Sequence, residues 1–311
     1  MIVKNWEYDD LDLFKYWRIS SNAIYPFTNK ENVYYLRFSP VDEKNEDEII
    51  AELEFLQYLK DSNYNAIETR LSINNKKLEV VETPWGRYNS VVFKRVKGDS
   101  LGEIELTDEI VLLWGKALGK LHRLSEKYKP STKKRSNWKD KLDWIEKILS
   151  EFPAEKQGLK EVKILREKLA SLPITEENYG LIHYDFELDN IFYNRSNNQI
   201  IPIDFDDSMY HWYMMDIERS INSIKSEVDP EKVDKFVELF IEGYSSEKSI
   251  QSSLLELIEV FERFGNLYGY ARVLRESKER WKNEPEWLEN LRKHLNRLLD
   301  ERSKFFGLPI N

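Results

Sequence analysis

The 311-residue chain contains no cysteine. This absence excludes disulfide bonds, thiolate metal sites and thiol nucleophiles together. Only four histidines are present, so a zinc site is disfavoured and any metal ion is expected to bind oxygen atoms. No apolar run approaches the roughly eighteen residues that span a membrane, and residues 1–7 do not resemble a signal peptide. We therefore expect a cytoplasmic protein with no membrane partner.

Glycine-rich phosphate-binding motifs are also missing. The chain has 11 glycines, but neither a G-x-G-x-x-G nor a G-x-x-x-x-G-K-[ST] pattern occurs. Gly115 and Gly119 are each followed by a lysine, but both fall in a stretch with helical periodicity. The simplest dinucleotide-binding and P-loop readings are therefore excluded.

Basic residues do not dominate the chain, whose formal net charge is −9 with a pI near 5.3. Such a protein is not expected to bind nucleic-acid phosphates. The one basic run, residues 133–135, is short and is interpreted as a solvated loop. Hydrophobic residues make up 41% of the sequence, which is enough for a packed core and argues against disorder. The length favours two lobes.

The most informative segment is residues 181–210, LIHYDFELDNIFYNRSNNQIIPIDFDDSMY. It holds an H-x-D-x-x-x-x-N pattern from His183 through Asp185 to Asn190, and Asp204 follows after two apolar runs separated by polar residues. Those runs predict a β-hairpin, which would bring Asp185, Asn190 and Asp204 together. One carboxylate could then deprotonate a hydroxyl while Asn and Asp hold Mg²⁺, as phosphoryl transfer requires. The alternative is a loop whose His and Asp only cap backbone groups.

This segment resembles the catalytic and metal-binding loops of the aminoglycoside phosphotransferase and choline kinase-like superfamily. Its members are small-molecule kinases with a protein-kinase-like fold. A looser resemblance runs from about Trp17 to the C-terminal helices. By this resemblance Asp185 would be the catalytic base, Asn190 and Asp204 would be the magnesium ligands, and His183 would support the loop.

Three further acidic residues belong to this comparison. Asp216 is similar to the family's later Asp that braces the catalytic loop from a following helix, although an ordinary helix cap is the alternative. Asp206 stands where protein kinases have Gly in their metal motif, and loop amides are favoured as its partners over a second metal ion. Glu187 stands where many family members carry His, so the acceptor side of this loop is unusual.

The resemblance implies an α+β, bilobal protein-kinase-like fold. Residues 1–97 would form a nucleotide-binding lobe with an antiparallel sheet and one helix, and residues 98–311 a larger, mainly helical lobe for catalysis and acceptor binding. The patterns predict a helix from about 46 to 60, and a second helix capped by Thr107. They also predict strands at 17–19, 23–25, 33–38, 66–73, 78–82 and 91–96.

The nucleotide would meet residues of the first lobe. Glu52 falls inside the apolar stripe of its helix, which is costly unless a cation such as Arg37 pairs with it. Kinase-like enzymes place a strand cation, usually Lys, against a helix Glu, and the cation grips the phosphates. A structural salt bridge or a half-exposed Glu is the alternative. The turn formed by Ser20, Ser21 and Asn22 stands where a Gly-rich loop would approach the phosphates, or it is an ordinary strand turn.

Residues 91–98 resemble the family's hinge between the lobes, which ends in a glycine. Carried over by position, Phe93 would wall the adenine pocket, and the carbonyl of Lys94 and the amide of Val96 would bond the base edge. An ordinary core strand is the alternative reading. Acceptor specificity would come from helices at about 232–244 and 254–278, whose aromatic residues are more often core than ligand wall.

The leading hypothesis is a small-molecule kinase that uses Mg²⁺ with ATP or GTP and phosphorylates a hydroxyl of an antibiotic. A metabolic kinase of the homoserine, choline or methylthioribose kinase type is one alternative, and a non-catalytic nucleotide-binding regulator is another. The acidic site would tolerate a cationic acceptor. A serine/threonine protein kinase is disfavoured because residues 207–216 leave no room for an activation segment. No nucleic-acid partner is expected, and a monomer is favoured.

Overall fold

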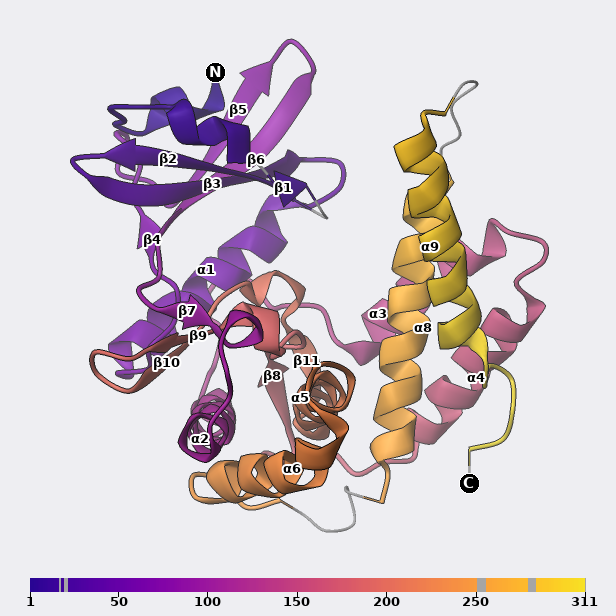
Figure 1. Ribbon diagram of the computed structural model, residues 1–311. Coiled ribbons are helices and arrows are strands. Elements are labelled where there is room, and N and C mark those ends of the chain that lie inside the picture. The colour runs from indigo at the N-terminus through magenta and orange to yellow at the C-terminus, as the bar shows by residue number, and fades with distance from the viewer. Residues whose placement is uncertain (17, 20–21, 251–255, 279–283, 311) are drawn as a thin grey trace. The chain divides into compact units, whose positions relative to one another are not determined.

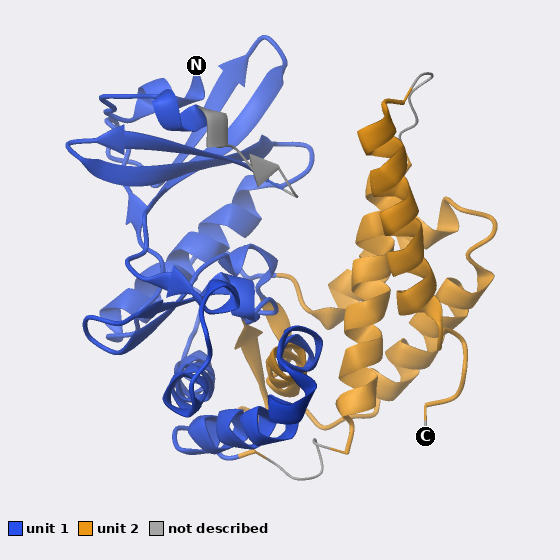
Figure 2. Cartoon of the chain, in the orientation of Figure 1, with its two compact units in different colours: residues 1–135, 183–208, 222–249 blue, residues 136–182, 209–221, 250–311 orange. Residues whose placement is uncertain are grey.

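The computed structural model describes residues 1–311 except 17, 20–21, 251–255, 279–283 and 311 (Figure 1). The chain divides into two compact units, shown in blue and orange in Figure 2. The first unit contains residues 1–135, 183–208 and 222–249, and the second contains residues 136–182, 209–221 and 250–311. The predicted lobe boundary at Gly98 therefore falls within the first unit, and the division into lobes at this residue stays a prediction. No helix among the described residues is long and apolar enough to cross a membrane.

An antiparallel sheet forms the N-terminal part of the first unit, as predicted. Its strands follow the order β1-β2-β3-β6-β4, and β5 also pairs with β6. The central pairing places Arg37 of β3 opposite Ile24 of β2 and Val91 of β6. The strands are β1 (Arg18–Ile19), β2 (Ala23–Asn29), β3 (Asn32–Pro40), β4 (Thr69–Arg70), β5 (Leu78–Thr83) and β6 (Gly86–Lys94).

Side-chain alternation along β3 separates the two faces of this sheet. Leu36 joins a buried cluster with Trp6 and other residues of the N-terminal segment, which includes the 3₁₀ helix η1 (Ile2–Asn5). Arg37 points the other way and reaches Glu52 of helix α1 (Glu46–Asp61). The N-terminus of α1 is capped by Asn45, whose side chain accepts from the Glu48 amide. One face of the sheet therefore packs on the apolar N-terminal segment, and the other face presents Arg37 to Glu52 of α1.

The rest of the first unit carries the sequence motif. The predicted hairpin is present as β9 (Ile191–Asn194) and β10 (Gln199–Pro202), and β7 (Asp99–Ser100) pairs with β9. Short 3₁₀ turns η3 (Leu101–Glu103), η4 (Leu188–Asn190) and η5 (Phe205–Asp207) flank these strands. Helix α2 (Asp108–Ser125) begins at the predicted cap, since the Thr107 side chain accepts from the Ile110 amide. It packs against α6 (Pro230–Ser245) so closely that a β-carbon at Gly115 would lie 2.0 Å from the Phe240 carbonyl oxygen.

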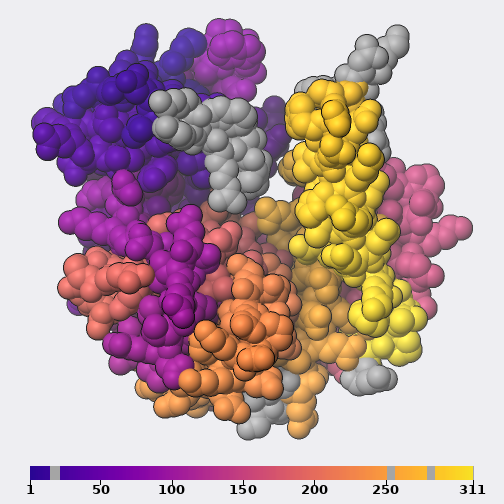
Figure 3. Space-filling model, viewed as in Figure 1, coloured from indigo at the N-terminus to yellow at the C-terminus, as the bar shows by residue number. Residues whose placement is uncertain are grey.

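The second unit is mainly helical. It contains α3 (Trp138–Ser150), α4 (Lys156–Ala170), α8 (Ile258–Glu276) and α9 (Glu286–Ser303), and the strand pair β8 (Tyr179–Ile182) with β11 (Met209–Trp212). Helix α5 (Met214–Glu227) begins in this unit and ends in the first. A buried ion pair joins Arg263 of α8 to Glu161 of α4. Helix α9 has no buried residue and is visible as a yellow surface ridge in Figure 3.

The aromatic residues of this unit behave as core. Trp212 and Phe264 are fully buried, and Tyr268 and Tyr270 are nearly so. The interpretation of these aromatics as packing residues is therefore confirmed for the side chains that the structure describes. Trp287, near the start of α9, was expected to be a packing residue as well, but 62% of it is exposed.

Candidate active site

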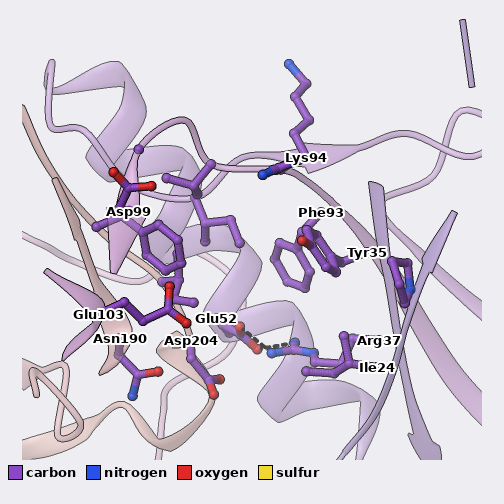
Figure 4. Close-up of a pocket in the computed structure, with 17 residues that line it drawn as sticks. Ile24, Tyr35, Arg37, Glu52, Phe93, Lys94, Asp99, Glu103, Asn190 and Asp204 are labelled. Carbon is purple, nitrogen blue, oxygen red and sulfur yellow. Dashed lines mark hydrogen bonds and ion pairs between the residues drawn. The ribbon is translucent and has the colours of Figure 1, made fainter. Parts of the chain in front are cut away.

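A cavity of about 440 Å³ lies wholly within the first unit. Three parts of the chain line it: the sheet with α1, the segment that follows β6, and the base of the β9–β10 hairpin. Figure 4 shows Arg37 and Glu52 beside one another, and Asn190 near Asp204 at a distance from Lys94. The cavity therefore collects side chains from the Arg37–Glu52 pair, the segment around Phe93 and the hairpin base, three of the sequence segments that were predicted to meet a nucleotide.

The hairpin places Asn190 and Asp204 next to each other. The amide of Ile203 donates to the carbonyl oxygen of Asn190 at 2.9 Å, which closes the hairpin one residue before Asp204. The Asn190 side-chain nitrogen donates to the Asp185 carbonyl oxygen at 3.2 Å. Asn190 and Asp204 both line the cavity, and half-buried Asp185 is tied to Asn190 by this bond. Asn190 and Asp204 thus lie together at the cavity, and Asp185 is joined to Asn190 through its backbone carbonyl. The convergence of the Asp185 carboxylate on this point and the chemical roles of all three residues stay predictions.

His183 holds the start of the loop against the metal motif. Its ring nitrogen Nε2 lies 2.9 Å from the Ile203 carbonyl oxygen, to which it donates when that nitrogen carries the proton. The His183 ring also packs on Phe205, with 4.3 Å between ring centroids. His183 thus contacts residues on both sides of Asp204, while its role in supporting a catalytic loop stays a prediction.

Asp204 is suited to hold a cation. Its backbone is left-handed, with φ of 59°, and its carboxylate opens onto the cavity. Although Asp204 is exposed to solvent at the cavity, partial desolvation by the surrounding protein and repulsion from Asp206 raise its pKa to about 6, and nearby Arg37 opposes the rise. Among the described residues, no group of three or more His, Asp or Glu side chains is arranged to hold a metal ion alone. One carboxylate with one amide oxygen nevertheless fits Mg²⁺, which takes its remaining ligands from phosphates and water.

Arg37 and Glu52 form the predicted pair. The guanidinium donates two parallel hydrogen bonds, from Nη1 to Oε1 at 2.9 Å and from Nη2 to Oε2 at 2.6 Å. Both side chains are buried, yet both also line the cavity. Burial alone would lower the pKa of Arg37, but Glu52 and Asp206 outweigh it and raise that pKa above its usual value. A role for Arg37 in binding phosphates stays a prediction.

The partners of Asp206 differ from those expected. Loop amides were favoured, but its carboxylate contacts three side chains: Arg37 at 3.3 Å, Lys44, and Asn22, whose Nδ2 donates to Oδ2 at 2.9 Å. Burial alone would raise the pKa of Asp206, yet Lys44 and Arg37 hold that pKa well below its usual range. The reason is that β3, the residues before α1 and the β1–β2 turn all deliver polar groups to this point.

The Ser20–Asn22 turn is described only at Asn22. Ser20 and Ser21 lie outside the described residues, so their predicted approach to the phosphates is untested. Asn22 is buried and bonded to Asp206. Its side chain therefore joins the turn to the metal motif.

The end of β6 and the residues that follow it, which were predicted to form a hinge, border the cavity. Phe93, Lys94 and Val96 line the cavity, and the Arg37 guanidinium lies 4.8 Å from the centroid of the Phe93 ring. The Lys94 amide donates to Glu68, but within the described part of the chain the Val96 amide donates to no other residue. Gly98 follows with φ of 117°. Contacts of Lys94 and Val96 with a nucleotide base stay predictions.

Asp216 and Glu187 have local roles that the sequence alone did not specify. Asp216 lies in the first turn of α5, is fully buried and belongs to the second unit. There its charge partly opposes the burial that lowers the pKa of His211 to about 3. Bracing of the catalytic loop by Asp216 stays a prediction. The Glu187 carbonyl accepts from the Asn190 amide at 3.0 Å and so starts the η4 turn.

Sequence reasoning missed several residues at this site. Asp99 and Glu103 line the cavity, and Lys44 and Arg135 contact the metal motif. Lys44 and Arg135 act across 162 and 71 residues of chain, so no local pattern marks them. The position of Asp99 directly after Gly98 was the one available signal.

The family follows from comparison with known proteins. The sequence model of the phosphotransferase enzyme family matches residues 18–250. The chain belongs to this family. It is therefore a phosphotransferase with a kinase-like α+β fold. A curated relative, the amicoumacin kinase of Bacillus subtilis (strain 168), is 24% identical over 270 residues, which cover 84% of this chain and 79% of that protein.

Solved structures show the same fold. An amicoumacin kinase in complex with AMP-PNP, Ca²⁺ and Ami superposes with a TM-score of 0.81 at 21% identity, covering 100% of this chain and 93% of that chain. A microcompartment-associated aminopropanol kinase gives 0.71 at 20% identity, with 99% and 98% covered. A spectinomycin phosphotransferase gives 0.57 at 16% identity, with 92% and 86% covered. The predicted kinase-like fold and family are confirmed.

Proposed function

We propose that the protein transfers the γ-phosphate of ATP or GTP to a hydroxyl group of a small molecule, with Mg²⁺ on the nucleotide. The observation that carries this proposal is the cavity whose wall combines Asn190 and Asp204 with the segment after β6. A nucleotide base would lie against Phe93 and Val96, and its phosphates would point toward Asn190 and Asp204. AMP-PNP and Ca²⁺ in the complex of the amicoumacin kinase support a nucleotide with a divalent ion.

In this function the chain mainly positions and neutralises charge. Mg²⁺ on Asn190 and Asp204 would offset the charge of the transferring phosphoryl group. Asp185 would accept the proton of the acceptor hydroxyl while the hydroxyl oxygen bonds to the γ-phosphorus. The bond between the γ-phosphorus and the bridging oxygen would break, and ADP or GDP would leave. General-base catalysis of this kind contributes about 10²- to 10⁴-fold.

The acceptor is proposed to be a hydroxyl compound that also carries an amine. Asp99 and Glu103 add negative charge to the cavity wall, which would favour a cationic ligand. An antibiotic is supported by the amicoumacin kinase relative, and an amino alcohol by the aminopropanol kinase structure. A metabolic kinase acting on a homoserine-, choline- or methylthioribose-like compound is the alternative. A cytoplasmic location and a monomeric state also stay predictions.

The decisive experiment is an assay of ADP or GDP release over a panel of aminoglycosides, amicoumacin, aminopropanol, choline, homoserine and sugars. Acceptor-dependent release that needs Mg²⁺ and disappears in Asp185→Asn would support the proposal. Thermal-shift measurements with ATP and GTP should show that Asp185→Asn still binds nucleotide. Undiminished turnover in Asp185→Asn would refute the role of this residue.

A non-catalytic regulator makes a different prediction in the same experiments. It would bind the nucleotide with Mg²⁺ in the thermal-shift assay, but it would release no ADP or GDP with any acceptor. The atypical Arg37 is the feature that keeps this second candidate open, because arginine would reach phosphates differently from lysine.

A further inference from the structure

Arg135 occupies an unexpected position. The basic run at residues 133–135 was interpreted as a solvated loop, but Arg135 is buried with 5% exposed. The neighbouring Lys133 is exposed and pairs with Asp47 at the surface. The interpretation was therefore wrong for Arg135, because its side chain turns inward while the lysine turns outward.

The Arg135 guanidinium is bonded entirely to backbone carbonyls in the contacts that the structure describes. Nε donates to the Ser208 oxygen at 2.7 Å, Nη2 donates to the Asp206 oxygen, and Nη1 donates to the Glu48 oxygen at 2.9 Å. A planar group with donors in a fixed fork can join carbonyls on separate segments, whereas an ammonium cannot reproduce that geometry. The position thus specifically suits arginine.

These carbonyls belong to two parts of the site. Asp206 and Ser208 follow Asp204 in the metal motif, and Glu48 lies in the first turn of α1, one turn before Glu52. Arg135 therefore ties the loop that carries the proposed metal ligand to the helix that carries the partner of Arg37.

Two other links join α1 to this loop. Arg37 pairs with both Glu52 of α1 and the Asp206 carboxylate, but it contacts no backbone carbonyl of the loop in the contacts that the structure describes. Phe55 of α1 packs edge-on against Phe205 with 6.1 Å between ring centroids. Because the hydrophobic effect is non-directional, this contact restrains the loop less sharply than hydrogen bonds do. Hydrogen bonds to Asp206 and Ser208 fix the backbone on the C-terminal side of Asp204 and so restrict where its carboxylate can lie.

We propose that Arg135 is a positioning residue that sets the affinity of the site for the divalent ion by fixing the Asp204 loop to α1. The proposal rests on the proposed function of Asp204 as a metal ligand. Residues that orient metal ligands without touching the ion typically change metal affinity or activity by about 10- to 100-fold when replaced. Arg135 would act through Asp204 in this way.

Arg135→Lys is the first test, because lysine keeps the positive charge but lacks the planar guanidinium that donates to three carbonyls at once. Phosphoryl transfer, or nucleotide binding by calorimetry, is measured as a function of Mg²⁺ concentration. We expect the Mg²⁺ concentration for half-maximal signal to rise by about tenfold or more, and saturating Mg²⁺ to restore most of kcat. Lys133→Ala is the matched control, because it removes a neighbouring cation that also contacts α1 but not the loop.

A second variant keeps the test decisive if lysine perturbs folding. Arg135→Ala leaves a space where free guanidinium can bind, and millimolar guanidinium is far below denaturing concentrations. We expect guanidinium, but not ammonium, to lower the Mg²⁺ requirement of this variant toward that of the wild type. If only guanidinium, with its planar set of N–H donors, restores the Mg²⁺ requirement, the effect of the substitution is on the position of the loop and not on stability in general.

The proposal is overturned if Arg135→Lys lowers the melting temperature while its Mg²⁺ requirement stays within about twofold of the wild type. It is also overturned if guanidinium restores the melting temperature of Arg135→Ala without changing its Mg²⁺ requirement. Failure of the proposed function would look different. In that case the wild type itself, and Asp204→Ala beside it, would show no Mg²⁺-dependent binding or turnover.

Discussion

The amide nitrogen of Asn190 donates to the backbone carbonyl of Asp185 at 3.2 Å. This bond fixes which end of the Asn190 amide is occupied, so its oxygen remains for another partner. Asn190 lines the cavity together with Asp204. One side chain therefore holds the catalytic loop with its nitrogen and would offer its oxygen to a divalent ion.

Replacement of Asn190 by alanine should weaken Mg²⁺-dependent nucleotide binding. The variant loses both the oxygen ligand and the bond to the Asp185 carbonyl, and a hydrogen bond between neutral groups alone contributes about 0.5–1.5 kcal/mol. We expect at least a tenfold loss of affinity by calorimetry with Mg²⁺ and little change without it. Asn197→Ala, in the turn of the same hairpin, is the control. An equal loss with and without Mg²⁺ would argue against metal binding by Asn190.

Replacement of Glu52 by glutamine should destabilise the protein strongly. Removing one member of a buried ion pair costs about 3–5 kcal/mol when the remaining charge stays buried without a partner, and Asp206, which also pairs with Arg37, should place the cost toward the lower end of this range. Urea unfolding measures this cost directly. The exposed pair of Arg87 and Glu82 provides the control, since Glu82→Gln should cost less than about 1 kcal/mol. Similar costs for the two variants would show that the Arg37–Glu52 pair is not isolated from water.

Asp204 should make the metal-free protein less stable as pH rises. Its pKa is raised from 3.8 to about 6 in the folded state, so the folded state binds more protons than the unfolded state between these values. The contribution of Asp204 to the free energy of unfolding therefore falls as pH rises through this window and then levels off. His211, whose pKa is lowered to about 3 in the folded state, contributes the opposite slope, so the variant and the wild type have to be compared. Without divalent ions, Asp204→Asn should gain stability relative to the wild type as pH rises, and urea unfolding of both proteins from about pH 4 to about pH 7 tests the sign of this difference.

The same protonation should affect metal binding in the opposite direction. Mg²⁺ binds the ionised carboxylate, so its affinity should increase as pH rises toward and past about 6. Calorimetry with the nucleotide at several pH values would measure this change. A Mg²⁺ affinity independent of pH across that range would contradict the raised pKa.

Gly98 should not tolerate a side chain. A β-carbon there would lie 2.4 Å from the Tyr193 carbonyl oxygen, and φ is 117°. Gly86 has a similar φ of 124°, but a β-carbon there would have nothing within 4 Å. Gly86→Ala therefore measures the cost of backbone strain alone, about 1–3 kcal/mol, without a steric clash. We expect Gly98→Ala to lower the melting temperature clearly more than Gly86→Ala. Equal effects would mean that the segment after β6 can move away from β9.

Local patterns were sufficient for the hairpin, the Thr107 cap and the Arg37–Glu52 pair. Each depends on residues close in sequence or on a burial cost that demands a partner. The predicted strand at 23–25 stopped before Pro26, but β2 continues to Asn29. Pro26 is tolerated because β1 pairs only with Ala23 and Ile24 of β2, so the proline lies where no second strand needs its missing amide hydrogen.

The charged surroundings of Asp206 were beyond such reasoning. Lys44 and Asn22 reach Asp206 from segments more than 160 positions away along the chain. Arg135 looked solvated because its two neighbours are lysines, and the direction of one side chain in a basic run is decided by tertiary packing. Resemblance to a family located the metal motif but did not identify the groups that hold it in place.

The first unit is built from three stretches of chain separated by residues of the second. During translation the strands around Arg37 leave the ribosome long before Asn190 and Asp204 do. When synthesis has just passed residue 135, Arg135 has been made but Asp206 and Ser208, whose carbonyls accept its hydrogen bonds in the folded protein, have not. The proposed nucleotide site can form only after the β9–β10 hairpin has been synthesised. We therefore expect a folding intermediate that lacks Asn190 and Asp204 at this site and that is sensitive to chaperones.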